Sequence, residues 1–367
     1  MSAKPIILYE SIHTPADLQE LRSTQRIWEE RDVYESQLKE FFEITHPALC
    51  VVPEFAEKQR QYVTERAAGQ EIVLRGNWIY FPWSGMLAHA VGEKEYFALK
   101  TNRNRNIITR EEQQRLQNFR VGIVGLSVGS NVATTLAYSG IARTIKLAEF
   151  DTLETTNLNR IRARIDQIGM RKIDIVSQQL YEIDPYIHLA HLADGLTKDT
   201  LSSFVLEEPK PQLIFEIIDS FEMKIHLREL ARAHRIPVIM VTNLGDRVLM
   251  DVERYDTNPD AVFFNGRAGM VPRDILARPD ITAADKHRYA VELAGGTKHV
   301  PQRALDSVDE IGKTLVGRPQ LASTVTASGS FGAYLTKKIA LGEHIPSTSW
   351  LVDFDTVFSS QSPFVIY

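Results

Sequence analysis

Residues 120–133, RVGIVGLSVGSNVA, combine an apolar run, three glycines and the beginning of a helical pattern. The run 120–126 is typical of a strand that is buried on both faces. Gly125 and Gly129 allow a turn in which backbone amides and a helix N-terminus can face a phosphate. The stretch therefore predicts either a strand–turn–helix unit that binds a nucleotide or a tight turn with a structural role only.

The glycine spacing alone does not choose a nucleotide. Gly125-Leu-Ser-Val-Gly129 is one residue shorter than G-x-G-x-x-G, and Ser127 stands where a glycine is expected. Glu149 follows at the end of a second apolar run, where an acidic side chain can bind ribose hydroxyls. It can equally be a solvated strand end. Together, the turn and the acid indicate a nucleotide and do not distinguish NAD from ATP.

Outward from this unit, short apolar strands alternate with helices up to about residue 255. This rhythm predicts an α/β fold, a Rossmann-like, doubly wound and mostly parallel sheet with helices on both faces. A small-residue helix at 321–341 and a last strand at 350–355 close the domain. Between them, 255–318 reads as a long irregular crossover loop, which is usually functional. We expect an adenylation-type domain at 101–367 and a smaller N-terminal α+β region at 1–100.

The N-terminal region carries a charged, amphipathic helical pattern over 15–66 and short strands around Gly76 and Gly85. Its aromatic residues at 78–83 are typical of a packed hairpin. The region either extends the core and a dimer interface or recognises substrate. In the second case, exposed strand edges around residues 77–83, NWIYFPW, would pair with an extended peptide.

Composition narrows the class of protein. The 367 residues carry a net charge of −5, which argues against a nucleic-acid groove. No apolar run is long enough to span a bilayer, so we expect no membrane partner and a cytoplasmic enzyme. Cys50 is the single cysteine, which excludes an intramolecular disulfide and a cysteine-cluster zinc site. We expect Cys50 to be buried as an apolar residue.

The residues after Glu149 favour a nucleoside triphosphate. The run 150–175, FDTLETTNLNRIRARIDQIGMRKIDI, holds an Asn-x-Asn-Arg cluster and a lysine at a helix start. Phosphates need cations, and an α-phosphate transition state needs donors aimed at developing negative charge. A dinucleotide-dependent oxidoreductase would leave these residues unused.

With these residues in place, the chain resembles the ThiF/MoeB/HesA superfamily, the fold of ubiquitin-activating enzymes. It is most similar to a ThiF-like branch sometimes fused to nitroreductase-like domains. The resemblance covers about 100–255 well and 320–355 more loosely. It implies that the protein adenylates a carboxylate with MgATP and releases pyrophosphate, so that ATP and Mg²⁺ are the expected cofactors.

The resemblance also assigns residues. The turn under the nucleotide would be shaped by Gly125, Ser127 and Gly129, and the ribose held by Glu149, with Asp151 beside it. The phosphates would be contacted by Asn157, Asn159, Arg160 and Lys172. Asp219 would bind magnesium, although alone it could cap the helix at 221–233. A homodimer would supply Arg105, or Arg103 as the second choice, across its interface.

The chain departs from the family in its cysteines. The two C-x-x-C pairs that bind a structural zinc are missing, so we expect no zinc. No cysteine follows Cys50, and thiol chemistry needs a thiolate. The acyl-adenylate is therefore the last intermediate, or a non-cysteine nucleophile captures it, as in modification of a peptide or natural-product precursor. The substrate would be a small-molecule or peptide carboxylate. The alternatives are an NAD(P)-dependent oxidoreductase and a non-catalytic scaffold.

Overall fold

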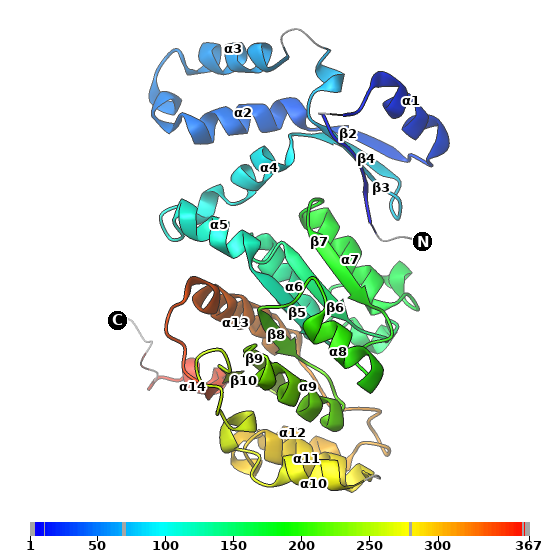
Figure 1. The fold of residues 1–367 in the computed structure, drawn as a ribbon, viewed down its shortest axis with the longest axis vertical. Coiled ribbons are helices and arrows are strands. Elements are labelled where there is room, and N and C mark those ends of the chain that lie inside the picture. Colours follow the sequence, from blue (N-terminus) through cyan, green and yellow to red (C-terminus); the bar gives the residue numbers. More distant parts are fainter. Residues whose placement is uncertain (1–3, 11, 68–70, 279–280, 362, 364–367) are drawn as a thin grey trace. The chain divides into compact units, whose positions relative to one another are not determined.

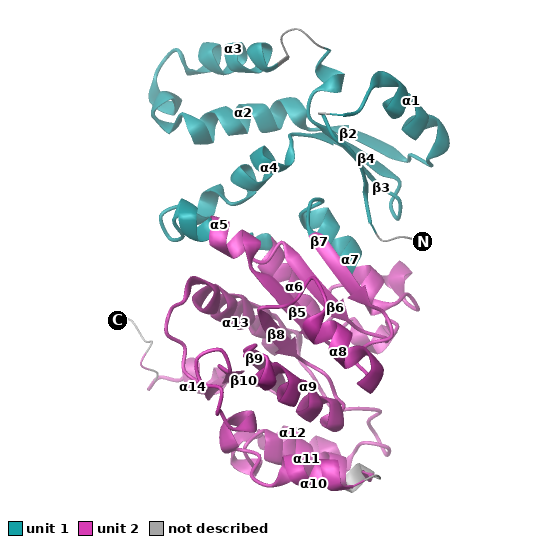
Figure 2. Ribbon diagram, in the orientation of Figure 1, with its two compact units in different colours: residues 1–113, 138–140, 177–187 teal, residues 114–137, 141–176, 188–367 magenta. Residues whose placement is uncertain are grey.

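The computed structural model describes residues 4–10, 12–67, 71–278, 281–361 and 363. The chain divides into two compact units (Figure 2). Unit 1 comprises Met1–Gln113, Tyr138–Gly140 and Ser177–Ile187, and unit 2 comprises Gln114–Ala137, Ile141–Val176 and His188–Tyr367. Each unit is described by itself.

Unit 1 contains a four-stranded sheet in the order β1-β3-β4-β2. Its strands are β1 (Ile6–Leu8), β2 (Glu29–Asp32), β3 (Asn77–Phe81) and β4 (Met86–Ala90). Its helices are α1 (Pro15–Thr24), α2 (Tyr34–Thr45), α3 (Phe55–Ala67) and α4 (Glu93–Lys100). The amphipathic run predicted over 15–66 is therefore interrupted by β2, which pairs in parallel with β4.

Two expectations for unit 1 are wrong. β3 hydrogen-bonds β1 on one side, at residues 78–80, and β4 on the other, so these residues have no strand edge left for a peptide. Cys50 is exposed rather than buried, because it lies in a 3-10 helix, Pro47–Val51, that buries none of its residues. The packed hairpin is confirmed for Trp78, which is 2% exposed and stacks on His89.

Unit 2 contains a seven-stranded sheet in the order β11-β10-β9-β8-β5-β6-β7 (Figure 1). Its strands are β5 (Arg120–Val124), β6 (Thr144–Ala148), β7 (His188–Leu192), β8 (Leu213–Glu216), β9 (Val238–Leu244), β10 (Arg247–Glu253) and β11 (Thr348–Asp353). Neighbours from β7 to β9 pair in parallel, whereas β10 and β11 pair antiparallel. The predicted α/β fold, mostly parallel and Rossmann-like, is confirmed.

Helices accompany these strands along the chain. They are α5 (Arg110–Asn118), α6 (Gly129–Tyr138), α7 (Lys172–Ile183), α8 (Lys198–Leu206), α9 (Phe221–Ala233), α13 (Ala322–Leu341) and α14 (Phe354–Val357). α13 is the expected small-residue helix. A Cβ added at Gly329 would lie 2.6 Å from the carbonyl oxygen of Asn131 on α6, so its glycine allows the two helices to pack closely.

The crossover region is not irregular, contrary to expectation. It forms α10 (Val271–Ala277), α11 (Ala283–Leu293) and α12 (Gln302–Asp309), which lie together in Figure 1. Side chains of α10 and α11 are buried in one cluster with residues of α9, β9 and β10, which includes Ile275, Tyr289 and Leu293. Burial of this apolar surface stabilises the helices on the sheet.

Within the described residues, no helix is long and apolar enough to cross a membrane.

Candidate active site

The site lies at the carboxyl ends of the parallel strands of unit 2. The chain passes from β5 to β6 and β7 on one side and returns to β8 and β9 on the other. Such a reversal opens a crevice where ligands bind in α/β sheets. A cavity of about 410 Å³ lies there, lined by residues that follow β5, β6 and β8, by the end of β9, and by α11, α12 and residues 318–320.

The glycine turn borders this cavity. Gly125 has φ +88°, and a Cβ there would lie 2.0 Å from the carbonyl oxygen of Ile217, which follows β8. Only glycine combines that backbone conformation with so close an approach. Ser127 and Val128 then line the cavity, and α6 begins at Gly129. Because the first amides of a helix have no intrahelical acceptor, α6 presents donors to this turn.

Glu149, which directly follows β6, holds the glycine turn in place through hydrogen bonds. Its side chain is buried and accepts backbone hydrogen bonds from Leu126 (2.7 Å), Phe150 (2.9 Å) and Asp151 (3.0 Å). A buried carboxylate held by three amides fixes the loop after β5 to the loop after β6. Its binding of ribose remains a prediction, since it does not line the cavity.

The cationic end of the cavity is formed by Arg160 and Lys172. Arg160 donates from Nε to Ser127 Oγ (3.3 Å) and from Nη1 to Asn159 Oδ1 (2.9 Å). Lys172 is the first residue of α7, and its Nζ lies 2.8 Å from Asp151 Oδ2. Burial lowers the pKa of Arg160 and Asp219 opposes that effect, so the guanidinium, whose ordinary pKa is far above neutrality, stays charged.

Two asparagines hold the loop that carries Arg160. The buried Asn157 lines the cavity and accepts the backbone N–H of Glu154 through Oδ1 (3.1 Å). Asn159 donates from Nδ2 to the carbonyl oxygen of Gln320 (2.7 Å). The second contact ties the loop to the segment before α13, which is far away in the sequence.

Asp219 lies in the cavity with an exposed carboxylate. Its side chain is 92% exposed, and Oδ1 lies 2.7 Å from Nη2 of Arg318. The N-cap of α9 is Ser220, which accepts the N–H of Met223, so Asp219 is not the cap. Among the contacts described, the carboxylate takes part only in the ion pair with Arg318.

The structure brings most of the predicted residues together. Those that line the cavity are Ser127, Asp151, Asn157, Arg160, Lys172 and Asp219. Four more lie within two residues of a lining residue in the sequence but do not line the cavity themselves: Gly125, Gly129, Glu149 and Asn159. The remaining two, Arg103 and Arg105, are exposed residues of unit 1, and Arg105 donates to the carbonyl oxygen of Ile44 (3.4 Å).

Sequence reasoning missed a second group of lining residues. They belong to the end of β9, to the crossover helices and to the segment before α13, and include Asn243, Ala304, Leu305, Arg318 and Gln320. These residues carry no motif that would mark them. A capping signal at Thr282 and Asp285 could have identified α11, and with it one wall of the cavity.

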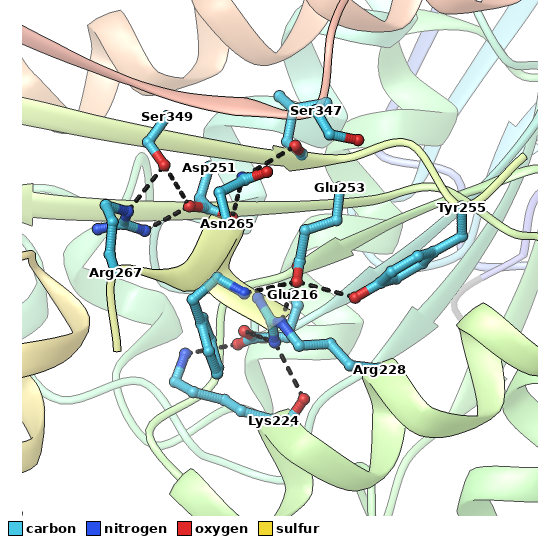
Figure 3. A network of polar contacts seen from close by, with 12 residues as sticks. Glu216, Lys224, Arg228, Asp251, Glu253, Tyr255, Asn265, Arg267, Ser347 and Ser349 are labelled. Atoms are coloured by element: carbon cyan, nitrogen blue, oxygen red, sulfur yellow. Dashed lines mark hydrogen bonds and ion pairs between the residues drawn. The ribbon is translucent and has the colours of Figure 1, made fainter. Parts of the chain in front are cut away.

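A network of buried charges, shown in Figure 3, reaches the cavity through Lys224. Glu216 accepts Lys224 Nζ (2.6 Å) through one oxygen and Arg228 Nη1 (2.8 Å) through the other. Nε of Arg228 lies 2.8 Å from Glu253 Oε2, close enough for an ion pair although not aligned as a hydrogen bond. Tyr255 donates to the other oxygen of Glu253 (2.8 Å). Lys224 also lines the cavity, so the network supports part of its lining.

Burial shifts the pKa values in this network. Burial raises the pKa of Glu253 to about 7, although Arg228 lowers it. For Glu216 burial acts in the same direction, but Lys224 and Arg228 outweigh it and hold the pKa of that carboxyl below its usual value. Burial lowers the pKa of Lys224, and Glu216 opposes that effect. The paired charges are therefore the main reason that these groups can be buried.

The chain is similar in sequence to a known protein family and to several known proteins. Residues 101–257 match the model of the ThiF family. A Mycobacterium tuberculosis protein, "Uncharacterized protein MT1398", is 36% identical over 276 residues, which are 75% of this chain and 38% of its own length. The tRNA threonylcarbamoyladenosine dehydratase of Bacillus subtilis is 27% identical over 168 residues, 44% of this chain and 65% of its own. The chain thus spans less than two-thirds of the length of these two curated relatives.

A solved structure is also similar. It is the Escherichia coli tRNA N6-threonylcarbamoyladenosine dehydratase in complex with AMP, with a TM-score of 0.47 and 18% identity over 67% of this chain and 95% of that one.

Proposed function

We propose that the protein is an ATP-dependent adenylating enzyme, from the premise that residues 101–257 form a domain of the ThiF family. The observation that carries the proposal is the cavity at the carboxyl edge of the parallel strands, which Arg160, Lys172 and the exposed carboxylate of Asp219 line together. This combination suits a triphosphate and a divalent cation better than an uncharged ligand.

The reaction joins a substrate carboxylate to AMP. A carboxylate oxygen attacks the α-phosphorus, the bond between the α-phosphorus and its bridging oxygen breaks, and pyrophosphate leaves with the electron pair. Arg160 and Lys172 donate to phosphate oxygens on which negative charge develops. A carboxylate is already the nucleophile, so the step needs no general base. The protein's main contribution besides charge is to hold the two reactants in line.

Asp219 fits a magnesium site. Mg²⁺ is usually held by one or two carboxylates together with substrate phosphates and water. The exposed Asp219 carboxylate lines the cavity, and its Arg318 partner is itself half exposed, so the ion pair is exchangeable. When bound, the ion would neutralise phosphate charge, which is the chemistry that this site needs.

The fate of the acyl-adenylate follows from the cysteine count. Cys50 is the only cysteine, so no residue of unit 2 can form a thioester. We propose that the adenylate is captured by a non-cysteine nucleophile, such as an amine, in the modification of a small-molecule or peptide precursor. A homodimer that donates Arg105 or Arg103 across its interface is part of the same proposal.

Titration calorimetry tests the proposal. The protein is titrated with MgATP, NAD(H), NADP(H) and FAD, beside Arg160→Ala and the matched control Arg162→Ala. Arg162 is exposed and lies outside the cavity lining. Magnesium-dependent ATP binding that is lost in Arg160→Ala and kept in Arg162→Ala is the expected result. Binding of a dinucleotide instead would refute adenylation, and binding of none of them would favour a scaffold.

A second variant addresses the metal. Asp219→Ala should abolish magnesium-dependent pyrophosphate release while the protein remains folded. Full activity in this variant would show that Asp219 does not hold the ion. The oxidoreductase alternative predicts that the same change leaves nicotinamide binding intact.

A further inference from the structure

The cavity has two chemically different ends. The residues from the loops after β5 and β6 and the start of α7 are mostly polar or charged, as described above for Arg160 and Lys172. The residues from α11, α12 and the segment between these helices are mostly apolar, and include Ala290, Val291, Leu293, Ala294 and Val300. A phosphate chain needs the first end and gains nothing from the second.

α12 forms a wall of the apolar end. Ala304, Leu305 and Val308 lie on one face of the helix, spaced as neighbours along it, and all three line the cavity. None of them is fully buried, whereas α10 and α11 contribute residues such as Ile275 and Tyr289 to a buried core. An apolar helix face that borders an open cavity can be covered by an apolar ligand.

Asn243, at the end of β9, carries a buried hydrogen-bond acceptor that has no partner among the described residues. The Ser328 hydroxyl donates its proton to the carbonyl oxygen of Thr324 (2.8 Å), so it can only accept from the Asn243 amide. Nδ2 of Asn243 therefore faces Ser328 (2.9 Å), and Oδ1 must point elsewhere. Oδ1 is buried and has no hydrogen-bond partner among the described residues, and Asn243 lines the cavity. Such an acceptor is costly unless a ligand N–H meets it.

We infer that the apolar end binds the acyl part of the substrate, and that this substrate is an N-acylated amino acid with an apolar side chain. Its carboxylate faces the cationic end, its side chain covers Ala304, Leu305 and Val308, and its amide N–H donates to Asn243 Oδ1. This inference rests on the proposed function, because adenylation places a carboxylate next to the phosphates. The N-acylated unit occurs both in free acyl amino acids and at the carboxyl terminus of a peptide.

Calorimetry with defined acids tests the inference. N-acetylleucine, N-acetylglycine, N-acetylaspartate and a tripeptide ending in leucine are titrated into the protein alone and into protein saturated with magnesium and the α,β-methylene analogue of ATP. We expect N-acetylleucine to bind about tenfold or more tightly than N-acetylglycine, because one buried leucine side chain suffices for that ratio. Preference for the tripeptide or for N-acetylleucine identifies the source. Equal binding of all acids, or preference for N-acetylaspartate, would overturn the inference.

Variants locate the effect. Ala304→Trp should fill the apolar end and remove the preference for leucine. Asp309→Ala is the matched control, since Asp309 is an exposed residue of the same helix outside the lining. If Ala304→Trp retains the full preference, the apolar end is not the acyl site.

A comparison of N-acetylleucine with an ester analogue tests the proposed contact between the amide N–H and Asn243. In 2-acetoxy-4-methylpentanoic acid an ester oxygen replaces the N–H of N-acetylleucine. The wild-type protein should bind this ester about tenfold more weakly, because Asn243 Oδ1 stays unpaired. In Asn243→Ala the two ligands should bind alike. Persistent discrimination in that variant would exclude Asn243 as the acceptor.

These measurements separate the two proposals. Failure of MgATP to bind refutes adenylation, but the acids are also titrated without nucleotide, and their ranking then still decides whether the apolar end recognises N-acylated apolar amino acids. Binding of MgATP without any ranking among the acids refutes the inference alone.

Discussion

If Asp219 binds magnesium as proposed, its ion pair with Arg318 sets a guanidinium in competition with the ion. Both groups are solvent-accessible, and an exposed pair of this kind contributes at most about 1 kcal/mol. Arg318→Ala should therefore lower the magnesium concentration needed for half-maximal ATP binding, by no more than about fivefold. Calorimetry at fixed ATP and varied Mg²⁺ measures that midpoint.

Arg303→Ala is a suitable control for this prediction, because Arg303 is exposed on α12 and lies outside the lining. A magnesium midpoint that does not move in Arg318→Ala, or that rises, would show that Arg318 does not compete for the metal site.

The site residues that could be predicted from the sequence are those that neighbouring residues in the chain identify. Gly125 was identified from its place between an apolar run and a helical pattern, and the structure shows why a glycine is needed there: φ is +88° and a Cβ would lie 2.0 Å from the carbonyl oxygen of Ile217. Arg160 and Lys172 follow β6 in the chain, and the resemblance to the ThiF/MoeB/HesA superfamily assigned them to the phosphates. Arg318 and Asn243 reach the cavity from distant segments, and no local pattern in the sequence reports such tertiary proximity.

Where α9, β10 and the turn after β10 meet, the buried network should make stability depend on pH. Glu253 has an ordinary pKa of 4.5 and one of about 7 in the folded protein. Between these values the folded state binds the extra proton, so this contribution is complete below about pH 4.5 and is lost as pH rises through about 7. The free energy of unfolding should fall over this window, by a ceiling of about 3 kcal/mol from 2.5 pKa units.

Urea unfolding at several pH values measures this slope, and Glu253→Gln should flatten it even if the variant is less stable overall. Glu216 does not disturb the window, because its lowered pKa places its own effect at more acidic pH. Burial lowers the pKa of His191, whose stability contribution rises with pH, and comparison with the variant separates the two. An unchanged slope in Glu253→Gln would contradict the assignment.

The sequence predicted long elements better than short ones. Strands such as β5 and helices such as α9 have clear apolar runs or periodicity, and both were found. The segment 255–318 was predicted irregular because α10 and α12 have only 7 and 8 residues, too few for a reliable period. Their helical form depends on packing against the sheet, which is a tertiary effect.

The helical pattern predicted over residues 15–66 missed the strand β2 for a related reason. β2, Glu29–Asp32, is exposed at all four residues and has no apolar alternation, so nothing in its sequence separates it from the helices around it. Only its pairing with β4 makes it a strand.

The proposed arginine donors and the cavity belong to different units of the chain, so complementation between mutant chains can test whether a partner subunit supplies the arginine. Arg105 and Arg103 belong to unit 1, and the cavity belongs to unit 2. If a partner subunit donates the arginine, Arg105→Ala and Arg160→Ala should each be inactive alone, yet mixed chains should form dimers with one intact site. Random reassociation at equal concentrations should restore about a quarter of wild-type pyrophosphate release, since half of the dimers are mixed and each has one working site of two.

The matched control mixes Arg160→Ala with Lys172→Ala. Both residues lie in the same cavity, so no mixed dimer contains an intact one and no activity should return. Arg103→Ala replaces Arg105→Ala in a parallel series to decide which arginine acts. If neither arginine variant loses activity alone, no donated arginine from this segment is needed. If a variant is inactive and mixing restores nothing, while the chains exchange, the arginine acts within its own chain and the cavity is complete without a partner.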